Sequence, residues 1–339
     1  MAAHNKVSAW EASGWIYEIN DSGAYIVTNW HVAELDDPTD IDVGFEGGRW
    51  AEATVVGANE PTDIAVIRVE NVPESATTVP VSRDSIERGQ EIAVFGSPLF
   101  YEETVTGGIV SGVNRSLTYQ NADDVTVPTA PMIQTDASIE FGSSGGPWVN
   151  CQGEVVGMTV AGPTSVTNFG ISSRALRVIV PAIIADGSYP LSYIGAGTID
   201  VDATVAEVND IDTTRGVMVA NLTANSPARN KLRPATAVSK GIRQYAIPVG
   251  GDVILAVDGV PVEDTADLYT YLYLETRPNE TVTFTVLRNG ERQRERVTVG
   301  EYPVRPPQTS TTTRATFSET TMTQSTTALS STETMSGRR

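Results

Sequence analysis

The chain has 339 residues, of which 40% are hydrophobic, so it is long enough to bury more than one core. Its net charge of −19 at pH 7, without a basic stripe, argues against nucleic acid or an anionic membrane as partner. Salt screens repulsion among surface charges, so the excess of 42 acidic over 23 basic residues predicts a halophilic protein that added KCl stabilises.

The sequence contains no membrane-spanning run, because none of its apolar stretches reaches the roughly 18 residues required. The segment Met1 to Lys6 lacks the apolar centre of a signal peptide. These observations leave the cellular compartment open. The protein would be extracytoplasmic if the natural start of the chain lies upstream of Met1. The single cysteine, Cys151, excludes an intrachain disulfide, and we expect it to be buried as a small apolar side chain.

The first half of the chain is predicted to consist of short strands. Residues 13–31 have the pattern of a hairpin, and β-rich runs follow at 53–57, 64–69, 91–95, 105–113, 131–136, 154–160 and 168–172. Turn residues separate these runs at intervals of about ten, which is typical of an all-β barrel or sandwich. Residues 173–186 have helical spacing, with Gly187 as the expected stop.

The second half, starting near Tyr189 or Tyr193, is predicted to be a small α+β module. Strands are expected at 217–220, 252–257, 281–287 and 296–299, with a helix capped by Asp264 or Thr265. The segment 231–250 is expected to be a long loop. Residues 308–339 contain 18 Ser or Thr in 32 positions, and this composition predicts disorder.

Three residue types that support acyl transfer occur at expected strand ends or turns. The run 141–148 places Ser143 and Ser144 among glycines, which suits either a tight turn or a nucleophile beside backbone N–H donors. His31 follows an expected strand and is the stronger base candidate of the two histidines, although a structural role is open. Asp63 precedes a buried-looking strand, where it is either a surface charge or a partner of the base.

Several motifs, in this order, resemble the HtrA/Deg family of trypsin-like serine proteases with a PDZ domain. The resemblance covers roughly residues 13 to 300 and rests on the segments 13–16, 28–32, 62–66, 103–111, 133–137, 142–147, 193–196, 226–228 and 251–259. It implies a mainly β fold: a trypsin-like double β-barrel at 1–187, an α+β PDZ domain at 188–302 and a disordered tail at 303–339.

The resemblance also implies roles for individual residues. His31 corresponds to the general base, Asp63 to its orienting partner and Ser144 to the nucleophile, and the N–H groups of Gly142 and Ser144 correspond to the oxyanion hole. In the PDZ domain the peptide-binding loop is implied at Tyr193, Ile194, Gly195 and Ala196. The substrate pocket is implied at Ser138, Ile139, Phe169 and Gly170. This pocket holds no acidic residue, so we expect cleavage after small or medium apolar residues.

The chain departs from the family pattern at two places. Ser143 stands where the family usually has Asn, and a neutral serine cannot receive a buried N-terminal ammonium group. Only twelve residues precede Ser13, so we expect either a missing barrel strand or a start upstream. Trimers in the family often use the segment before the Ser13 motif. A homo-oligomer is therefore one possibility, but the resemblance does not imply a trimer.

The resemblance therefore predicts an ATP-independent serine endopeptidase for unfolded or damaged proteins, without metal or organic cofactor. A nucleotide-binding Gly-rich loop with Lys-Ser/Thr is missing from the sequence, in agreement with ATP independence. The alternative is an inactive protease fold that serves as chaperone or peptide-binding scaffold.

Overall fold

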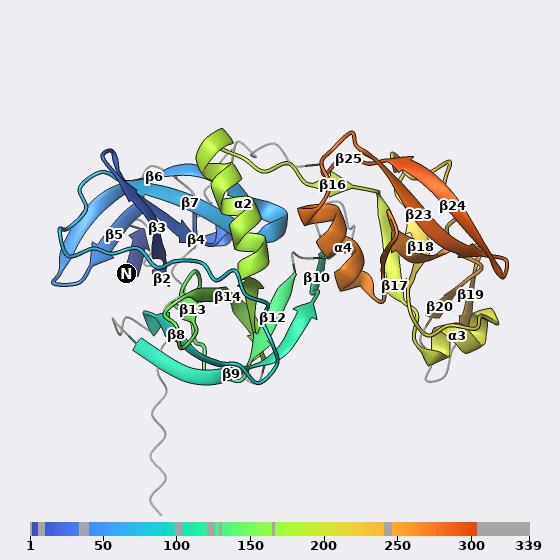
Figure 1. Cartoon of the computed structure of the whole chain (residues 1–339), viewed down its shortest axis with the longest axis horizontal. Coiled ribbons are helices and arrows are strands. Elements are labelled where there is room, and N and C mark those ends of the chain that lie inside the picture. The colour runs from blue at the N-terminus through green and yellow to red at the C-terminus, as the bar shows by residue number, and fades with distance from the viewer. Residues whose placement is uncertain are drawn as a thin grey trace, which may run out of the picture. The chain divides into compact units, whose positions relative to one another are not determined.

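The computed structural model describes residues 2–5, 11–33, 41–98, 104–120, 126–128, 131–164, 167–240 and 246–303. The predicted disordered tail lies outside these residues from position 304 onward. A seven-stranded antiparallel sheet, drawn in blue in Figure 1, has the order β2-β1-β5-β6-β7-β4-β3. Its strands are β1 Ala2–Asn5, β2 Glu11–Ser13, β3 Trp15–Asn20, β4 Gly23–Thr28, β5 Ile41–Phe45, β6 Arg49–Asn59 and β7 Ile64–Val69.

The predicted hairpin is confirmed, because β3 pairs with β4 across a turn at Asp21 and Ser22. The segment before Ser13 also contributes to this sheet, since β1 pairs with both β2 and β5. Ile26, Ile67 and Val69 are almost completely buried in its core. Apolar residues alternate along these strands, and every second side chain faces the same side of the sheet. Burial of that apolar face stabilises the sheet.

A closed barrel follows, with the strand order β12-β15-β14-β13-β8-β9. Its strands are β8 Glu91–Gly96, β9 Thr104–Arg115, β12 Met132–Thr135, β13 Pro147–Val149, β14 Val155–Thr164 and β15 Thr167–Ser172. Trp148 is fully buried inside it and donates its indole N–H to Thr159 Oγ1 at 2.9 Å. A separate ribbon pairs β10 Thr118–Gln120 with β11 Thr126–Pro128.

Helix α2, Ser173–Asp186, packs against strands of both sheets, namely β6 and β7 of the first and β14 and β15 of the second. Ser172 caps its start by accepting a hydrogen bond from the Ala175 N–H, and Gly187 ends it at φ +73°, as expected. The helix continues past Pro181 to Asp186. Two short elements complete this half, α1 Trp30–Ala33 and the 3₁₀ turn η1 Glu60–Thr62.

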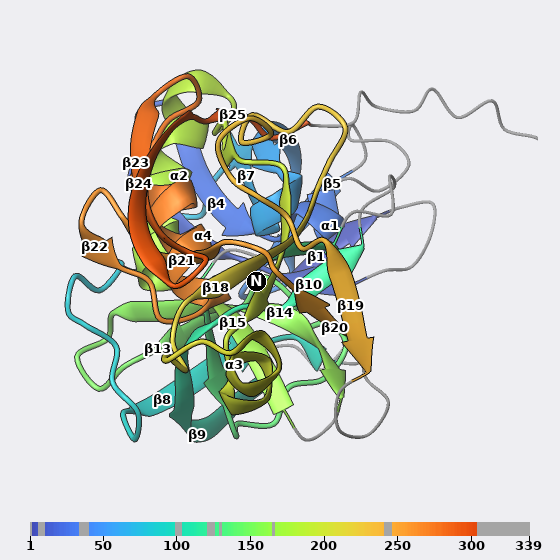
Figure 2. The same cartoon turned by 90° about the vertical axis from the view of Figure 1, so that its right-hand side faces the viewer.

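The second half is the predicted α+β module. Its main sheet has the order β17-β18-β21-β23-β24, and β22 pairs with β21. Figure 2 shows β23 and β24 side by side as a long hairpin. The elements are β16 Ser192–Tyr193, β17 Ala196–Asp200, α3 Ala203–Asn209, β18 Val217–Leu222, β19 Ala237–Lys240, β20 Ala246–Val249, β21 Val253–Val257, β22 Val260–Pro261, α4 Thr265–Leu274, β23 Thr281–Arg288, β24 Glu291–Thr298 and β25 Gly300–Glu301.

An ion pair is buried in this module. Arg288 donates to both carboxylate oxygens of Asp252, at 2.8 and 2.7 Å, and to Glu295 at 2.6 Å. Arg288 is 8% exposed and Asp252 only 1%. The hydrogen bonds to Asp252 raise the pKa of Arg288 above its usual value, so the guanidinium group stays protonated. Neither charge could stay buried without the other.

Two sequence-based expectations were wrong. Cys151 is exposed, because it lies in a turn that Asn150 organises by accepting the N–H groups of Gln152 and Glu154. The expected loop at 231–250 contains two paired strands, β19 and β20. None of the helices in the described residues is both long and apolar enough to cross a lipid bilayer.

Candidate active site

His31 and Asp63 form a close pair. The His31 Nδ1 lies 2.9 Å from Asp63 Oδ1 and 3.0 Å from Oδ2, and the His31 backbone N–H donates to Oδ1 at 3.1 Å. The histidine follows β4 in the short helix α1, and the aspartate precedes β7. β4 and β7 are paired, so neighbouring strand ends bring the two side chains together. A carboxylate at Nδ1 favours the tautomer with its proton there, which leaves Nε2 as the basic atom.

The backbone around Asp63 is fixed by two asparagines. Asn59 caps η1 by accepting the Thr62 N–H at 3.1 Å, and Asp63 follows in the left-handed conformation, at φ +53°. Asn29 donates from its side-chain amide to the Asp63 carbonyl at 3.0 Å and is fully buried. Asn29 was not predicted to have a role. Its position two residues before His31 was a signal that could have identified it as a support for the pair.

The serine turn depends on two glycines with positive φ. Gly142 has φ +97°, and a Cβ added there would lie 2.4 Å from the Ser97 carbonyl oxygen. Gly145 has φ +82°, and a Cβ would lie 2.5 Å from Thr28 Oγ1. Other residues would be strained at both positions and would collide with the backbone or side chain opposite. The turn therefore presses directly against the end of β4, three residues before His31.

Two backbone N–H groups of this turn are available as donors. Gly146 N–H donates to the Ser143 carbonyl at 2.9 Å, and Ser143 N–H donates to Glu140 at 3.1 Å. For the N–H groups of Gly142 and Ser144, by contrast, the described part of the chain supplies no acceptor. Unpaired donors at neighbouring positions are what an oxyanion requires.

The Ser144 side chain is the remaining member of the predicted triad. Ser144 is 8% exposed, and its carbonyl accepts the Ser13 N–H at 2.8 Å. Among the hydrogen bonds of the described residues, none joins the Ser144 hydroxyl to the His31 ring. Such contacts are often long in structures without substrate and tighten when it binds. The structure thus pairs His31 with Asp63 directly and places Ser144 near them through the turn.

The four residues of the predicted substrate pocket come from two connected segments. Ser138 and Ile139 follow β12, and Phe169 and Gly170 belong to β15, which pairs with β12. Thr106 donates to the Ser138 carbonyl at 2.7 Å, which anchors the first segment. Gly170 lies against Trp148, because a Cβ there would be 2.8 Å from the indole ring. The two predicted pocket walls are therefore neighbours.

The predicted peptide-binding loop of the second half is held by hydrogen bonds to a neighbouring turn. Ser226 donates to the Ile194 carbonyl at 2.7 Å, and the Gly195 carbonyl accepts the Thr223 N–H at 2.9 Å. Tyr193 and Thr223 are joined through their hydroxyl groups at 3.3 Å. The structure shows turns around Ser226. Gly195 has φ +65°, which a glycine adopts without strain.

Tyr269 of α4 reaches the same region. Its hydroxyl donates to the Ala196 carbonyl at 3.0 Å, and its burial raises the pKa of the phenol. Ala196 begins β17, which is an edge strand of the main sheet. An edge strand can accept an added peptide strand, and here one of its carbonyl groups already has an internal partner.

Comparison with known proteins supports this picture. A trypsin-like peptidase domain matches residues 12–158 and a PDZ domain matches residues 192–299. The serine protease Do-like HtrA of Lactococcus lactis subsp. lactis (strain IL1403) is 32% identical over 296 residues, covering 83% of this chain and 68% of the relative. A probable periplasmic serine endoprotease DegP-like of Halomonas elongata is 34% identical, and the chain spans 56% of its length.

Solved structures show the same fold. The HtrA-type protease AlgW with tripeptide has a TM-score of 0.68 at 27% identity, over 90% of this chain and 94% of that one. The serine endoprotease from Yersinia pestis has a TM-score of 0.59 at 25% identity, over 89% of this chain and 93% of that one. The predicted mainly β, trypsin-like fold with a PDZ domain is confirmed. The chain belongs to the HtrA/Deg family of trypsin-like serine proteases.

Proposed function

We propose that this chain is an ATP-independent serine endopeptidase that cleaves unfolded or damaged proteins. The observation that carries the proposal is the His31–Asp63 pair, 2.9 Å apart, beside a serine turn with two unpaired N–H groups. Relatives named serine endoproteases support the activity. The chemistry needs only side chains and water, so no metal or organic cofactor is part of the proposal.

In the proposed mechanism, the Ser144 oxygen attacks the carbonyl carbon of the scissile peptide bond. His31 Nε2 takes the hydroxyl proton, while Asp63 holds the Nδ1 proton and stabilises the imidazolium. The N–H groups of Gly142 and Ser144 stabilise the negative oxygen of the tetrahedral intermediate. Its collapse releases the amine product, which receives the proton from His31. A water molecule then hydrolyses the acyl-enzyme by the same steps.

Substrate selection is assigned to two places. We infer that Ser138, Ile139, Phe169 and Gly170 line an uncharged pocket for small or medium apolar residues, which are exposed mainly in unfolded chains. A peptide library cleaved mainly after Arg or Lys would refute that preference. The loop from Tyr193 to Ala196 would bind peptide C-termini or exposed segments beside β17. HtrA-type structures with tripeptide and decapeptide support peptides as ligands.

The proposed domain boundaries follow the sequence prediction, with the protease domain at 1–187, the PDZ domain at 188–302 and the tail from 303. The helix stop at Gly187 supports the first boundary. Strand β25, which ends at Glu301, supports the second boundary. A homo-oligomer is compatible with this proposal, and gel filtration with light scattering would measure its size.

The test compares degradation of β-casein in high salt by the unaltered chain, by Ser144→Ala and by the matched control Ser143→Ala. We expect Ser144→Ala to lose cleavage and labelling by a fluorophosphonate, whereas Ser143→Ala keeps both. Absence of cleavage by the unaltered chain, or equal cleavage by it and Ser144→Ala, would remove the enzyme assignment. Absence of cleavage by the unaltered chain, together with retained peptide binding, would favour a non-catalytic scaffold.

A further inference from the structure

Ser13 makes four hydrogen bonds at the junction between the first sheet and the barrel. Its hydroxyl donates to the Gly142 carbonyl at 2.8 Å and accepts the Ser97 N–H at 3.0 Å. Its backbone N–H donates to the Ser144 carbonyl, and its carbonyl accepts the Thr28 hydroxyl, each at 2.8 Å. Ser13 is 2% exposed. One residue from β2 thus binds both residues that carry the candidate oxyanion donors.

These contacts fix the direction of two peptide planes. The C=O and N–H of a trans peptide point in opposite directions, so a bonded carbonyl determines where the N–H of that plane points. In the plane after Gly142, Ser13 holds the carbonyl and Glu140 holds the N–H. In the plane after Ser144, Ser13 holds the carbonyl and Thr159 accepts the N–H at 3.1 Å. Both planes are therefore held at both ends.

The unpaired N–H groups of Gly142 and Ser144 belong to the planes directly before these two. Rotation of a held plane would therefore redirect the neighbouring donor. Building on the proposed endopeptidase activity, we propose that Ser13 is a positioning residue of the oxyanion hole. Its hydroxyl and N–H groups hold the carbonyls of Gly142 and Ser144 and thereby aim both donors at the reacting carbonyl oxygen.

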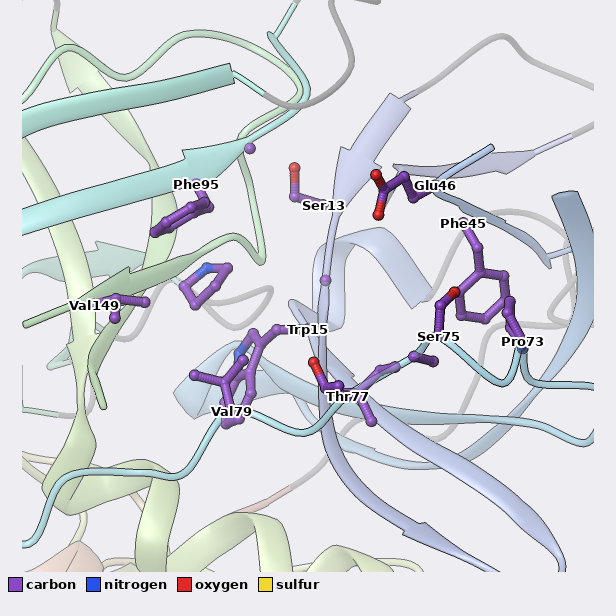
Figure 3. Close-up of a pocket in the computed structure, with 15 residues that line it drawn as sticks. Ser13, Trp15, Phe45, Glu46, Pro73, Ser75, Thr77, Val79, Phe95 and Val149 are labelled. Carbon is purple, nitrogen blue, oxygen red and sulfur yellow. The ribbon is translucent and has the colours of Figure 1, made fainter. Parts of the chain in front are cut away.

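The surroundings of Ser13 determine how large the effect of its hydroxyl should be. Ser13 lines a hollow of about 370 Å³. In the view of Figure 3 it lies between Phe95 and Glu46. Without the hydroxyl, a water molecule in its place could bridge the Ser97 N–H and the Gly142 carbonyl, which the hydroxyl now joins. Deletion of a complete oxyanion donor costs about 10²- to 10³-fold in kcat. A displaced donor with partial replacement by water should cost less, about 10- to 100-fold.

The test measures hydrolysis of a short peptide ester by Ser13→Ala, and by Thr276→Val as control. Thr276 is buried, donates to the Leu272 carbonyl and is hydrogen-bonded to the Ser192 hydroxyl, both at 2.7 Å, and it lies far along the chain from the serine turn. For Ser13→Ala we expect kcat to fall about 10- to 100-fold with KM within about threefold. The control should keep kcat.

A second readout separates positioning from a merely structural role. A peptide boronic acid forms a tetrahedral adduct that uses the oxyanion hole, whereas the matching product acid does not. Boronate affinity should fall by the same factor as kcat in Ser13→Ala, with product affinity unchanged. The pH profile should keep its position, because His31 and Asp63 are untouched. Ser13→Thr, which restores a hydroxyl, should regain activity.

If Ser13→Ala does not fold, Ser13→Cys replaces it, because the thiol has nearly the same shape but is a weak donor. A folded Ser13→Ala or Ser13→Cys with the kcat of the unaltered chain would overturn the proposal. So would a loss of kcat without loss of boronate affinity. Because Ser144→Ala is assayed alongside, inactivity of the unaltered chain would refute the endopeptidase itself and is distinguishable from failure at Ser13.

Discussion

Replacement of Gly142 by alanine should abolish most catalysis while leaving the protein folded. The residue has φ +97°, and an added Cβ would lie 2.4 Å from the Ser97 carbonyl oxygen and 3.2 Å from the Pro98 Cα. Both contacts are to backbone, so neither can be relieved by rotating a side chain. The turn must move away from Ser97, and the Gly142 N–H moves with it.

The size of the effect has two parts. Forcing a residue with a Cβ into a positive φ costs of order 1–3 kcal/mol of stability. Displacing an oxyanion donor costs about 10²- to 10³-fold in kcat, or roughly 3 kcal/mol of transition-state stabilisation. The second part should dominate the measured activity. KM should change little, because the donor binds the transition state more strongly than the ground state.

Gly153→Ala is the matched control, because Gly153 has φ +78° and no atom lies within 4 Å of its added Cβ. Both variants should unfold at lower urea concentration, Gly142→Ala by more because its Cβ also meets backbone, but only Gly142→Ala should lose kcat on a short peptide ester. If Gly142→Ala kept the kcat of the unaltered chain, the described turn would not be the oxyanion hole. Equal loss of kcat in both variants would indicate a general effect of strain.

Four further predictions concern stability and peptide binding. Tyr269→Phe frees the Ala196 carbonyl and should strengthen binding of a C-terminal peptide, measured by calorimetry, at a cost of about 1 kcal/mol in stability. Arg288→Met leaves a buried carboxylate unpaired and should lower the free energy of unfolding by about 3 kcal/mol, whereas Arg215→Met, at an exposed pair, should change it little. Burial raises the pKa of Asp264, so the folded state takes up a proton there more readily than the unfolded state does. As pH falls from 7 to 4, the free energy of unfolding of the unaltered chain should therefore rise relative to that of Asp264→Asn. The urea midpoint should rise with added KCl, and an unchanged midpoint would contradict the halophile prediction.

Local sequence signals predicted the elements whose ends are marked by specific residue types. Helix α2 stops at Gly187 and α4 starts after Asp264, because a left-handed stop and a side-chain cap each need particular residues. The pairing of His31 with Asp63 was predictable, because their motifs occur in the order typical of the family. The candidate catalytic residues were thus predictable from residue type and order.

Contacts between segments far apart in the chain could not be predicted in the same way. Ser13 was part of a recognised motif, but its hydrogen bond to Gly142 spans 129 positions and has no local signature. Cys151 was expected to be buried as a small apolar side chain, whereas Asn150 draws the chain into an exposed turn. β19 and β20 are short strands that pair with each other, so neither was recognisable from its own residues alone.

The site is divided between two sheets, and this division explains where its geometry is sensitive. His31 and Asp63 are fixed within the first sheet by strand pairing, so their contact survives small movements of the barrel. Ser144 belongs to the barrel and meets the first sheet where Gly145 lies against Thr28 and where Ser13 binds its carbonyl. Alignment of the proposed nucleophile with its proposed base therefore depends on that junction. A change there should alter kcat before it alters the pairing of base and carboxylate.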